Sequence, residues 1–272
     1  MTPLYIDNHC HLNFDDYDAD REAVIARMKE QGVGAIVVGV DRKSSEEVVA
    51  LAEKHDNLYA IVGLHPIYAG GYAGREAFDY DFYKNLIQSN KKVVGIGECG
   101  FDYASMDPED HRLQDVAFRG QVKLANELGK PLMLHLRNNR DGDLSKNAYN
   151  DALAILKTES KVPGEAHFFA GTLPQATDFL GLGYYISFTG VVTFVDAYND
   201  LVRYIPEDRL LSETDAPYVA PVPHRGKRCE PQFVIETVKE MAEIRGIADN
   251  EADRRAFFNK LVENSRKLYG IF

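Results

Sequence analysis

Cysteine is scarce in this chain, with three residues among 272. A small, odd number of cysteines argues against a disulfide framework and favours a reducing compartment. No apolar run reaches the roughly 18 residues that a membrane-spanning helix needs. The first residues, Met1 to Asp7, show no basic stretch followed by an apolar one, so no secretory signal is visible. We therefore expect a cytoplasmic protein that is not bound to a membrane.

Positive charge is also limited. Lys and Arg number 31 against 42 Asp and Glu, which gives a net charge of −11. This balance disfavours broad, nonspecific adhesion to nucleic acid or anionic membranes, but it leaves room for a local cationic site. The hydrophobic content of 45% is typical of a globular protein. No linker, low-complexity tract or charge block interrupts the chain, so we expect a single domain over residues 1–272.

Short apolar runs alternate with amphipathic stretches of helical periodicity along most of the chain. The candidate strands are Leu4–Asn8, Ala35–Val40, Leu58–Leu64, Val93–Gly97, Pro131–Leu134, Gly164–Phe168, Tyr184–Phe188 and Arg209–Glu213. The candidate helices are Asp20–Gln31, Ser44–His55, Asp79–Ser89, Asp110–Leu128, Asn147–Lys157, Leu173–Leu180, a weaker Val195–Tyr204, and the terminal pair Pro231–Ile244 and Asn250–Leu268. Strands that alternate with helices predict parallel βα units. Eight such units predict an α/β fold, a (β/α)8 TIM barrel with extra C-terminal helices.

Six potential metal ligands fall at the ends of five of these strands. They are His9, His11, Glu98, His135, His167 and Asp215. Side chains along a strand alternate between faces, so His9 and His11 point the same way while Cys10 faces the helix layer. Functional groups of such barrels come from the carboxyl ends of the strands, and we therefore expect the six residues to meet around one point.

This set of ligands predicts two divalent cations. His9, His11 and Asp215 would hold one ion, His135 and His167 would hold the other, and Glu98 would bridge the two so that they activate a shared water. Mixed nitrogen and oxygen ligands without a thiolate suit magnesium, manganese or zinc equally. Taken alone, Glu98 has a second interpretation as an ion-pair partner of Arg137, and His65 as an ordinary buried histidine.

A cationic centre inside an acidic protein favours anionic substrates, phosphodiesters above all. Arg137, two residues after His135, is a candidate phosphate clamp, as are Arg225, Lys227 and Arg228 after the eighth strand. An ordinary solvated loop is the alternative interpretation of that basic run.

Several motifs occur in a characteristic order. They are His9-Cys-His11, Gly97-Glu-Cys-Gly-Phe-Asp-Tyr103, His135-Leu-Arg137, His167-Phe-Phe-Ala-Gly171, Glu213-Thr-Asp-Ala-Pro217, and Pro221 to Pro231. Together they resemble the TatD family of metal-dependent hydrolases, deoxyribonucleases within the amidohydrolase-like barrels. The resemblance implies the barrel, the two-metal site with the six ligands above, DNA cleavage supported by magnesium, manganese or zinc, and roles near the site for His65 and Glu213. Departures from the family pattern, such as Ile67 for His and Phe168 for Cys, affect the substrate pocket.

The predicted reaction is hydrolysis of a phosphodiester, with Asp215, Glu98 and Glu213 as catalytic residues and Asp215 also accepting the proton of the water. We expect Arg137 and Arg225 to bind phosphate oxygens, and Phe168, Phe169 or Tyr103 to stack on a terminal base. The expected partner is DNA, as single strands or 3′ ends cleaved by a 3′–5′ exonuclease, with no obligate protein partner. Two alternatives remain: hydrolysis of a small lactone, amide or aminoacyl ester, and a non-enzymatic scaffold.

Overall fold

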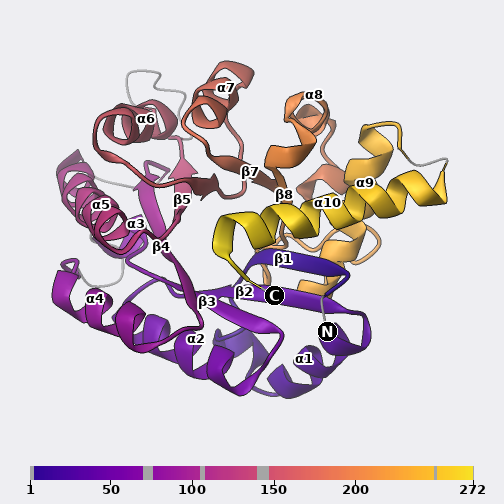
Figure 1. Ribbon diagram of the computed structural model, residues 1–272, viewed down its shortest axis with the longest axis horizontal. Coiled ribbons are helices and arrows are strands. Elements are labelled where there is room, and N and C mark those ends of the chain that lie inside the picture. Colours follow the sequence, from indigo (N-terminus) through magenta and orange to yellow (C-terminus); the bar gives the residue numbers. More distant parts are fainter. Residues whose placement is uncertain (1–2, 70–75, 105–107, 140–146, 248–249, 272) are drawn as a thin grey trace.

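Eight parallel strands form the centre of the molecule and helices surround them (Figure 1). The computed structural model describes residues 3–69, 76–104, 108–139, 147–247 and 250–271. The strands follow one another around the sheet in chain order, β1 to β8. They are β1 Tyr5–Cys10, β2 Val33–Val38, β3 Leu58–Val62, β4 Val93–Asp102, β5 Leu132–Arg137, β6 Gly164–Ala166, β7 Tyr185–Phe188 and β8 Leu210–Ser212. The predicted (β/α)8 architecture is confirmed.

The helices fall where the amphipathic stretches predicted them. They are α1 Arg21–Glu30, α2 Arg42–Lys54, α3 Pro66–Ala69, α4 Tyr80–Ser89, α5 Pro108–Leu128, α6 Ala148–Glu159, α7 Leu173–Gly181, α8 Asn199–Tyr204, α9 Val234–Ile244 and α10 Glu251–Tyr269. The expected helix Ser44–His55 begins earlier, because Asp41 caps it and accepts a hydrogen bond from the backbone N–H of Ser44. The short α3 was not predicted. No helix in the described ranges is long and apolar enough to cross a membrane.

β1 and the segment after β8 close the ring. The backbone N–H of His11 donates to the carbonyl of Ala216 at 2.7 Å, and that of Asp215 donates to the carbonyl of His9 at 2.9 Å. β1 also contains a bulge, because three steps from Asp7 to Cys10 oppose only two steps of β2. An extra residue shifts the alternation of side chains. Ile6 and His9, three positions apart, therefore both face the inside of the barrel.

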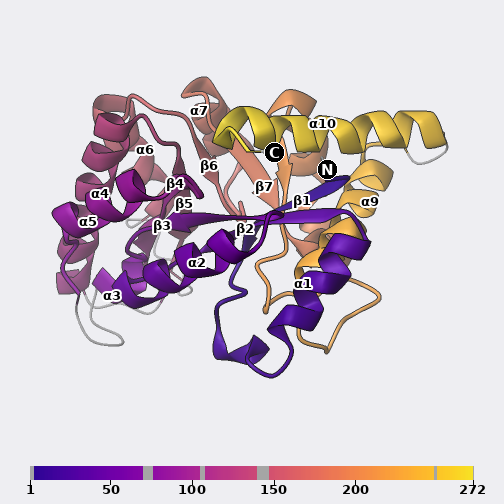
Figure 2. The ribbon, with the colours of Figure 1, turned by 60° about the horizontal axis from the view of Figure 1, so that its bottom comes forward.

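The inside of the barrel is packed with apolar side chains at one end and open at the other. Ile6, Ile61 and Met133 of the strands pack in one cluster with Leu268 and Tyr269 of α10. Figure 2 shows α10 lying across the end of the barrel that is opposite to the loops following β1 and β8. The cluster closes the amino-terminal end of the barrel, so that a site is accessible only from the carboxyl ends of the strands.

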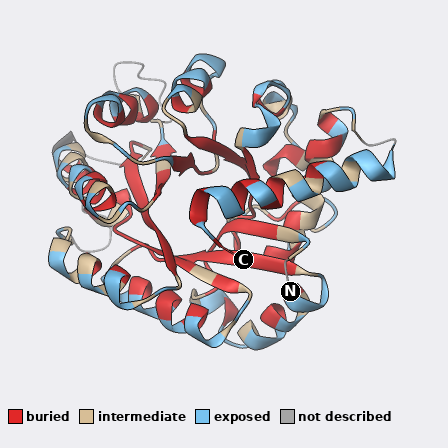
Figure 3. Ribbon diagram, in the orientation of Figure 1, coloured by how far each residue is buried: buried red, intermediate tan, exposed pale blue. Residues whose placement is uncertain are grey.

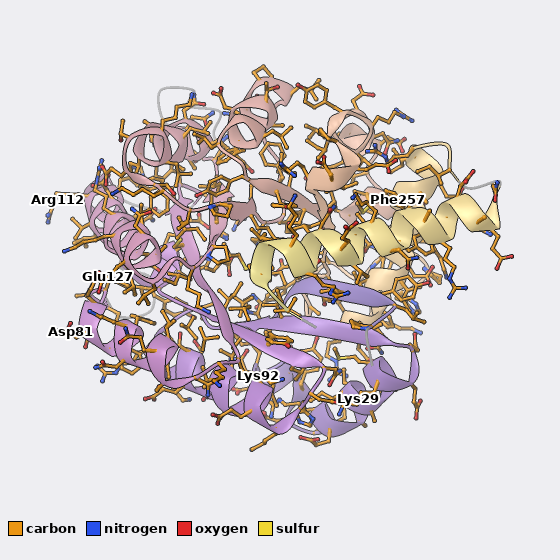
Figure 4. The ribbon with its side chains drawn as sticks, viewed as in Figure 1. Lys29, Asp81, Lys92, Arg112, Glu127 and Phe257 are labelled. Carbon is orange, nitrogen blue, oxygen red and sulfur yellow. The ribbon has the colours of Figure 1, made fainter. Side chains whose placement is uncertain are left out.

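The burial of the residues follows the arrangement of strands inside and helices outside. Most strand residues are buried, whereas each outer helix is buried on its inner face and exposed on its outer face (Figure 3). Charged side chains such as Lys29, Asp81 and Glu127 lie on the outside of the helix ring (Figure 4). A second, larger apolar cluster fills the space between strands and helices and contains Cys10, as its position in the strand predicted, and also Cys99.

Candidate active site

Two histidines and an aspartate form the first part of the site. The Nε2 atoms of His9 and His11 lie 3.1 Å apart, and each lies 3.6 Å from Oδ1 of Asp215. His9 is fully buried at the end of β1, and Asp215 follows β8. These three donors lie close enough to one another to share one cation.

Glu98 occupies the centre of the second part. Its Oε1 lies 2.8 Å from Nδ1 of His135, 3.3 Å from Nε2 of His167 and 3.6 Å from Nε2 of His65, while its Oε2 lies 3.5 Å from Nε2 of His9. The carboxylate therefore contacts donors from four strands or strand ends. This is the central position that the sequence predicted for Glu98, and its alternative partner Arg137 lies near a different carboxylate, Asp102.

The grouping of the donors differs in detail from the prediction. The donors that could share one ion with Glu98 form two sets, His9 with His167 and His65 with His135. His65 thus belongs to the cluster itself. The donor atoms are imidazole nitrogens and carboxylate oxygens, while the thiol of the neighbouring Cys10 points away and contacts the carbonyl of Ile36. Such a set fits divalent cations that prefer nitrogen and oxygen ligands.

Groups behind the histidines determine which ring nitrogen faces the cluster. Nδ1 of His11 lies 3.0 Å from the carbonyl of Val38, and Nδ1 of His167 lies 3.0 Å from Oε1 of Glu213. His135 is reversed: its Nε2 lies 2.9 Å from Oδ2 of Asp102 and its Nδ1 faces Glu98. Acceptors of this kind fix the orientation and the tautomer of metal-binding histidines.

Asp102 is a functional residue that the sequence prediction missed. The predicted fourth strand ended at Gly97, whereas β4 continues to Asp102, which places this carboxylate on the barrel beside β5. The backbone of Asp102 exchanges two hydrogen bonds with the side-chain amide of Gln114. The signal available in the sequence was its place in the Gly-Phe-Asp motif, four residues after Glu98.

Glu213 lies elsewhere than expected. Its carboxylate was predicted to face the mouth as a catalytic group, but it is fully buried behind His167. Its Oε1 accepts a hydrogen bond from the backbone N–H of Phe168 at 2.7 Å as well as contacting His167, and its Oε2 accepts one from the hydroxyl of Ser187 at 3.0 Å. With both oxygens engaged, Glu213 positions His167.

The backbone around the two carboxylate ligands is unusual. Asp215 has a φ of 59°, and Gly97, next to Glu98, has a φ of 150°. A Cβ atom on Gly97 would lie 2.4 Å from the carbonyl oxygen of Met133, so only glycine fits there. The buried carboxylate of Asp7 accepts hydrogen bonds from the N–H and the hydroxyl of Thr214, and these hold the residue before Asp215 in place.

The electrostatics of the cluster are strongly coupled. Burial raises the pKa of Glu98, but the surrounding histidines outweigh burial and hold that pKa well below its usual value. Burial lowers the pKa of His135, but Asp102 and Glu98 raise it to about 9. Burial and His135 lower the pKa of His65 to about 3. The cluster without a metal ion therefore holds protons on some of its histidines, and a cation that binds there displaces them.

A cavity of about 660 Å³ opens above the cluster. Its walls are mainly apolar or aromatic, and they include Phe14, Tyr68, Leu136, Phe168 and Tyr218. Among the described residues that line it, Arg137 is the only arginine or lysine. The cavity is within the usual size range of small-ligand sites.

The predicted substrate-binding residues divide into two groups. His65, Arg137 and Phe168 line the cavity. Tyr103 does not: its hydroxyl donates to Asp151 at 2.8 Å, and its ring packs in the layer between strands and helices, where Phe169 is also buried. Stacking of these two rings on a base is therefore contradicted. The prediction placed both rings at the mouth, whereas they pack in the core between the strands and the helices.

The basic run after β8 also lies outside the cavity lining. Arg228 is held in a structural network, because its guanidinium binds both oxygens of Asp20 at 2.7 and 2.8 Å and also contacts Glu230. It is therefore not a phosphate clamp. Arg225 and Lys227 are exposed, and Arg225 lies over the ring of Phe194, 3.9 Å from the ring centre.

A parallel barrel with a buried cluster of histidines and carboxylates at the carboxyl ends of its strands is typical of metal-dependent hydrolases. The chain belongs to the TatD family: residues 6–270 match the family described as TatD related DNase.

Known proteins resemble this chain over almost its whole length. The uncharacterized metal-dependent hydrolase YabD of Bacillus subtilis is 37% identical, with 98% of this chain and 100% of the relative covered. The uncharacterized metal-dependent hydrolase YcfH of Escherichia coli is 35% identical, with 90% of each chain covered. Among solved structures, the TatD homolog YjjV of Escherichia coli superposes with a TM-score of 0.85 at 29% identity and full coverage of both chains.

Proposed function

We propose that this protein is a phosphodiesterase that removes nucleotides from DNA ends with the help of two divalent cations. The observation that carries the proposal is the position of Glu98, which contacts donors of His9, His65, His135 and His167 at the floor of a cavity open to solvent. The family description as a DNase supports a nucleic-acid substrate.

We propose the following roles for the residues of the cluster. His9, His11 and Asp215 would hold one cation and Glu98 would contact both. His135 and His167 would hold the other cation, because their ring nitrogens lie nearer to Oε1 of Glu98, at 2.8 and 3.3 Å, than that of His65 at 3.6 Å. Two such ions supply Lewis-acid activation of water and of the phosphate. Asp215 is partly exposed to the cavity, which suits it to accept the proton of the attacking water. Arg137 would neutralise a non-bridging phosphate oxygen, and Phe168 would contact the terminal base.

The shape of the cavity favours action at a strand end. Its floor carries the cluster at the carboxyl ends of the strands, and its volume of about 660 Å³ suits a single terminal nucleotide better than a duplex. With one guanidinium in its described lining, the cavity matches one phosphate group at the cluster. These features support exonuclease action on single strands or 3′ ends.

The apolar walls favour a second candidate function, hydrolysis of a small carbonyl compound such as a lactone, an amide or an aminoacyl ester. Most of the residues that line the cavity are apolar or aromatic, which is typical of a site for an uncharged ligand. The same donor cluster serves both reactions, so the substrate has to be decided by experiment.

Turnover of defined substrates tests the two functions. Metal-stripped protein, reconstituted separately with magnesium, manganese or zinc, is incubated with single-stranded DNA labelled at its 3′ end, with bis(p-nitrophenyl) phosphate, and with a panel of lactones and esters. We expect metal-dependent release of mononucleotides, lost in Glu98→Ala and retained in the exposed-surface control Arg255→Ala. Cleavage of carbonyl substrates alone would replace the phosphodiesterase with the second candidate.

A further inference from the structure

Exposed apolar side chains gather beside the mouth of the cavity. The described residues include seven large hydrophobic side chains that are strongly exposed, and three of them are Phe194 at 40%, Tyr218 at 51% and Val222 at 46%. Phe194 follows the 3₁₀ turn Gly190–Thr193 after β7, and the other two follow β8. Solvent exposure of apolar side chains in one place is unfavourable unless the surface binds something.

The segments that carry these side chains are joined to each other. The backbone N–H of Val222 donates to the hydroxyl of Thr193 at 2.9 Å, and that hydroxyl donates to the carbonyl of Gly190 at 2.7 Å. A Cβ atom on Gly190 would lie 2.8 Å from the carbonyl oxygen of Val219, so the two segments touch through their backbones. The exposed surface is therefore held in place from both sides.

Arg225 adds a cation to this surface. Its Nη1 donates to the carbonyl of Ala220 at 2.9 Å, and its guanidinium carbon lies 3.9 Å from the centre of the Phe194 ring. The side chain remains exposed, and so does the neighbouring Lys227. We call the surface of Phe194, Val222 and Arg225 the outer ledge. An arginine held over an aromatic ring presents a stacking surface and hydrogen-bond donors to a phosphate at the same time.

The outer ledge is continuous with the cavity. Tyr218 and Val219 line the cavity, and Val222 and Arg225 of the ledge follow them in the loop after β8, while the segment of Phe194 touches Val219 through Gly190. Figure 2 shows this loop on the side of the molecule where the strands end, opposite to α10. A ligand that fills the cavity and extends beyond it on this side meets the ledge next.

We propose that the outer ledge is a second binding subsite for single-stranded nucleic acid, which holds the nucleotides adjoining the one in the cavity. The proposal rests on the proposed function in that the cavity takes the end of the strand. Aromatic and guanidinium surfaces combined with positive charge bind single strands in a sequence-tolerant way. In a protein of net charge −11, the two exposed cations attract a polyanion only locally, which directs the strand to this side of the mouth.

Binding in the absence of turnover tests the ledge independently of catalysis. Fluorescence anisotropy in EDTA compares labelled thymidine octanucleotide with labelled thymidine dinucleotide. We expect the octanucleotide to bind at least about tenfold more tightly, and Phe194→Ala and Arg225→Ala each to weaken its binding about tenfold with little effect on the dinucleotide. In Arg225→Ala the slope of log affinity against log salt should fall by about 0.7, the value for one phosphate contact on a single strand.

Matched control variants distinguish the contribution of the outer ledge to binding from the general effect of losing an exposed aromatic ring or cation. Tyr204→Ala removes an aromatic ring of similar exposure, 46%, at the end of α8, and Arg255→Ala removes an exposed cation from α10. Neither should change octanucleotide binding. Phe194→Leu and Arg225→Lys keep bulk and charge, and thereby distinguish loss of stacking from collapse of the loop. An abasic octamer, which has phosphates without bases, should be insensitive to Phe194→Ala.

The binding and turnover experiments distinguish failure of the outer-ledge proposal from failure of the proposed phosphodiesterase activity. Equal affinity for octanucleotide and dinucleotide, or unchanged octanucleotide affinity in both ledge variants, overturns the ledge even if DNA is hydrolysed. Weaker octanucleotide binding in the ledge variants, in a protein that hydrolyses no DNA with any metal, supports the ledge and overturns the phosphodiesterase instead.

Discussion

Asp102 touches two residues with different tasks. Its Oδ2 lies 2.9 Å from Nε2 of His135, a candidate metal ligand, and 3.8 Å from Nη1 of Arg137, the cavity's guanidinium. At the scale of single residues the sequence indicated which side chains carry the chemistry, because histidines and carboxylates at strand ends are conspicuous. It did not indicate which carboxylates act directly and which orient a neighbour, because Glu213 and Asp102 differ from Glu98 only in what they contact.

Asp102→Asn should weaken metal binding because the amide keeps the shape of the side chain but loses its charge. We expect an apparent metal affinity about 10- to 100-fold lower, as is usual for loss of an acceptor behind a histidine ligand. Competition with a chromogenic chelator measures this without any turnover. Asp178→Asn, at an exposed ion pair with Lys157, is the control. Unchanged metal affinity in Asp102→Asn would show that His135 binds metal without a charged acceptor at Asp102.

At the scale of elements, the sequence located the strands and most of the helices within a few residues. It missed the bulge in β1 and the extension of β4, and both change what faces the site. A bulge is a mismatch between two strands that are far apart in the chain, so periodicity within one strand cannot reveal it. Tyr103 was assigned to the mouth because the predicted strand ended at Gly97, although β4 continues to Asp102 and the ring packs against the helices.

Arg228 ties the loop after β8 to the start of α1, and this link should be sensitive to acid. Hydrogen bonds from Arg228 hold the pKa of Asp20 below its ordinary value. Burial raises the pKa of Glu230, but Arg27, Gln232 and Arg228 lower it further than burial raises it. Both carboxylates therefore stabilise the fold above their ordinary pKa values, near 3.8 and 4.5, and lose that contribution as the pH falls through their lowered values.

Arg228→Met should consequently lower stability near neutral pH and flatten the loss of stability between about pH 5 and pH 2. Urea unfolding of metal-stripped protein across this pH range measures the effect. Arg255→Met, on the exposed face of α10, is the control. An unchanged pH dependence in Arg228→Met would mean that this ion-pair network contributes nothing to the fold.

Leu268 attaches α10 to the closed end of the barrel. The side chain is buried against strand residues such as Ile6 and Met133. Leu268→Ala should lower the free energy of unfolding by about 2–5 kcal/mol, as expected for a buried leucine. The exposed Arg255→Ala on the same helix should change it by less than about 0.5 kcal/mol. Thermal and urea unfolding measure both, and equal effects would show that α10 does not seal the barrel.

At the scale of the whole molecule, folding buries ionisable side chains close together, and this arrangement is unfavourable until a cation binds among them. Seven histidine and carboxylate side chains from six strands and the loops after them converge on one point: His9, His11, His65, Glu98, His135, His167 and Asp215. Burying such groups costs stability unless they are paired. Cations that bind the folded chain and not the unfolded one offset this cost by mass action.

Metal addition should therefore stabilise the folded protein. At a free metal concentration of 100 times the dissociation constant, one site contributes about 2.7 kcal/mol. Calorimetric melting of stripped protein with and without manganese measures the shift in Tm. Glu98→Ala, which removes the shared carboxylate, should lose most of the shift, whereas Arg255→Ala should retain it. A shift of equal size in Glu98→Ala would place the stabilising ions elsewhere.

The sequence by itself determined the alternation of strands and helices, and hence the barrel, because periodicity and turn chemistry act within short segments. It also identified the candidate ligands, because the carboxyl ends of parallel strands share one end of the barrel. Only the tertiary structure decided that His65 joins the cluster, that Asp102 and Glu213 lie behind the histidines, and that Arg225 joins Phe194 beside the mouth while Arg228 stabilises the fold. These outcomes depend on register, bulges and loop contacts between segments up to about 200 residues apart, such as Arg228 with Asp20.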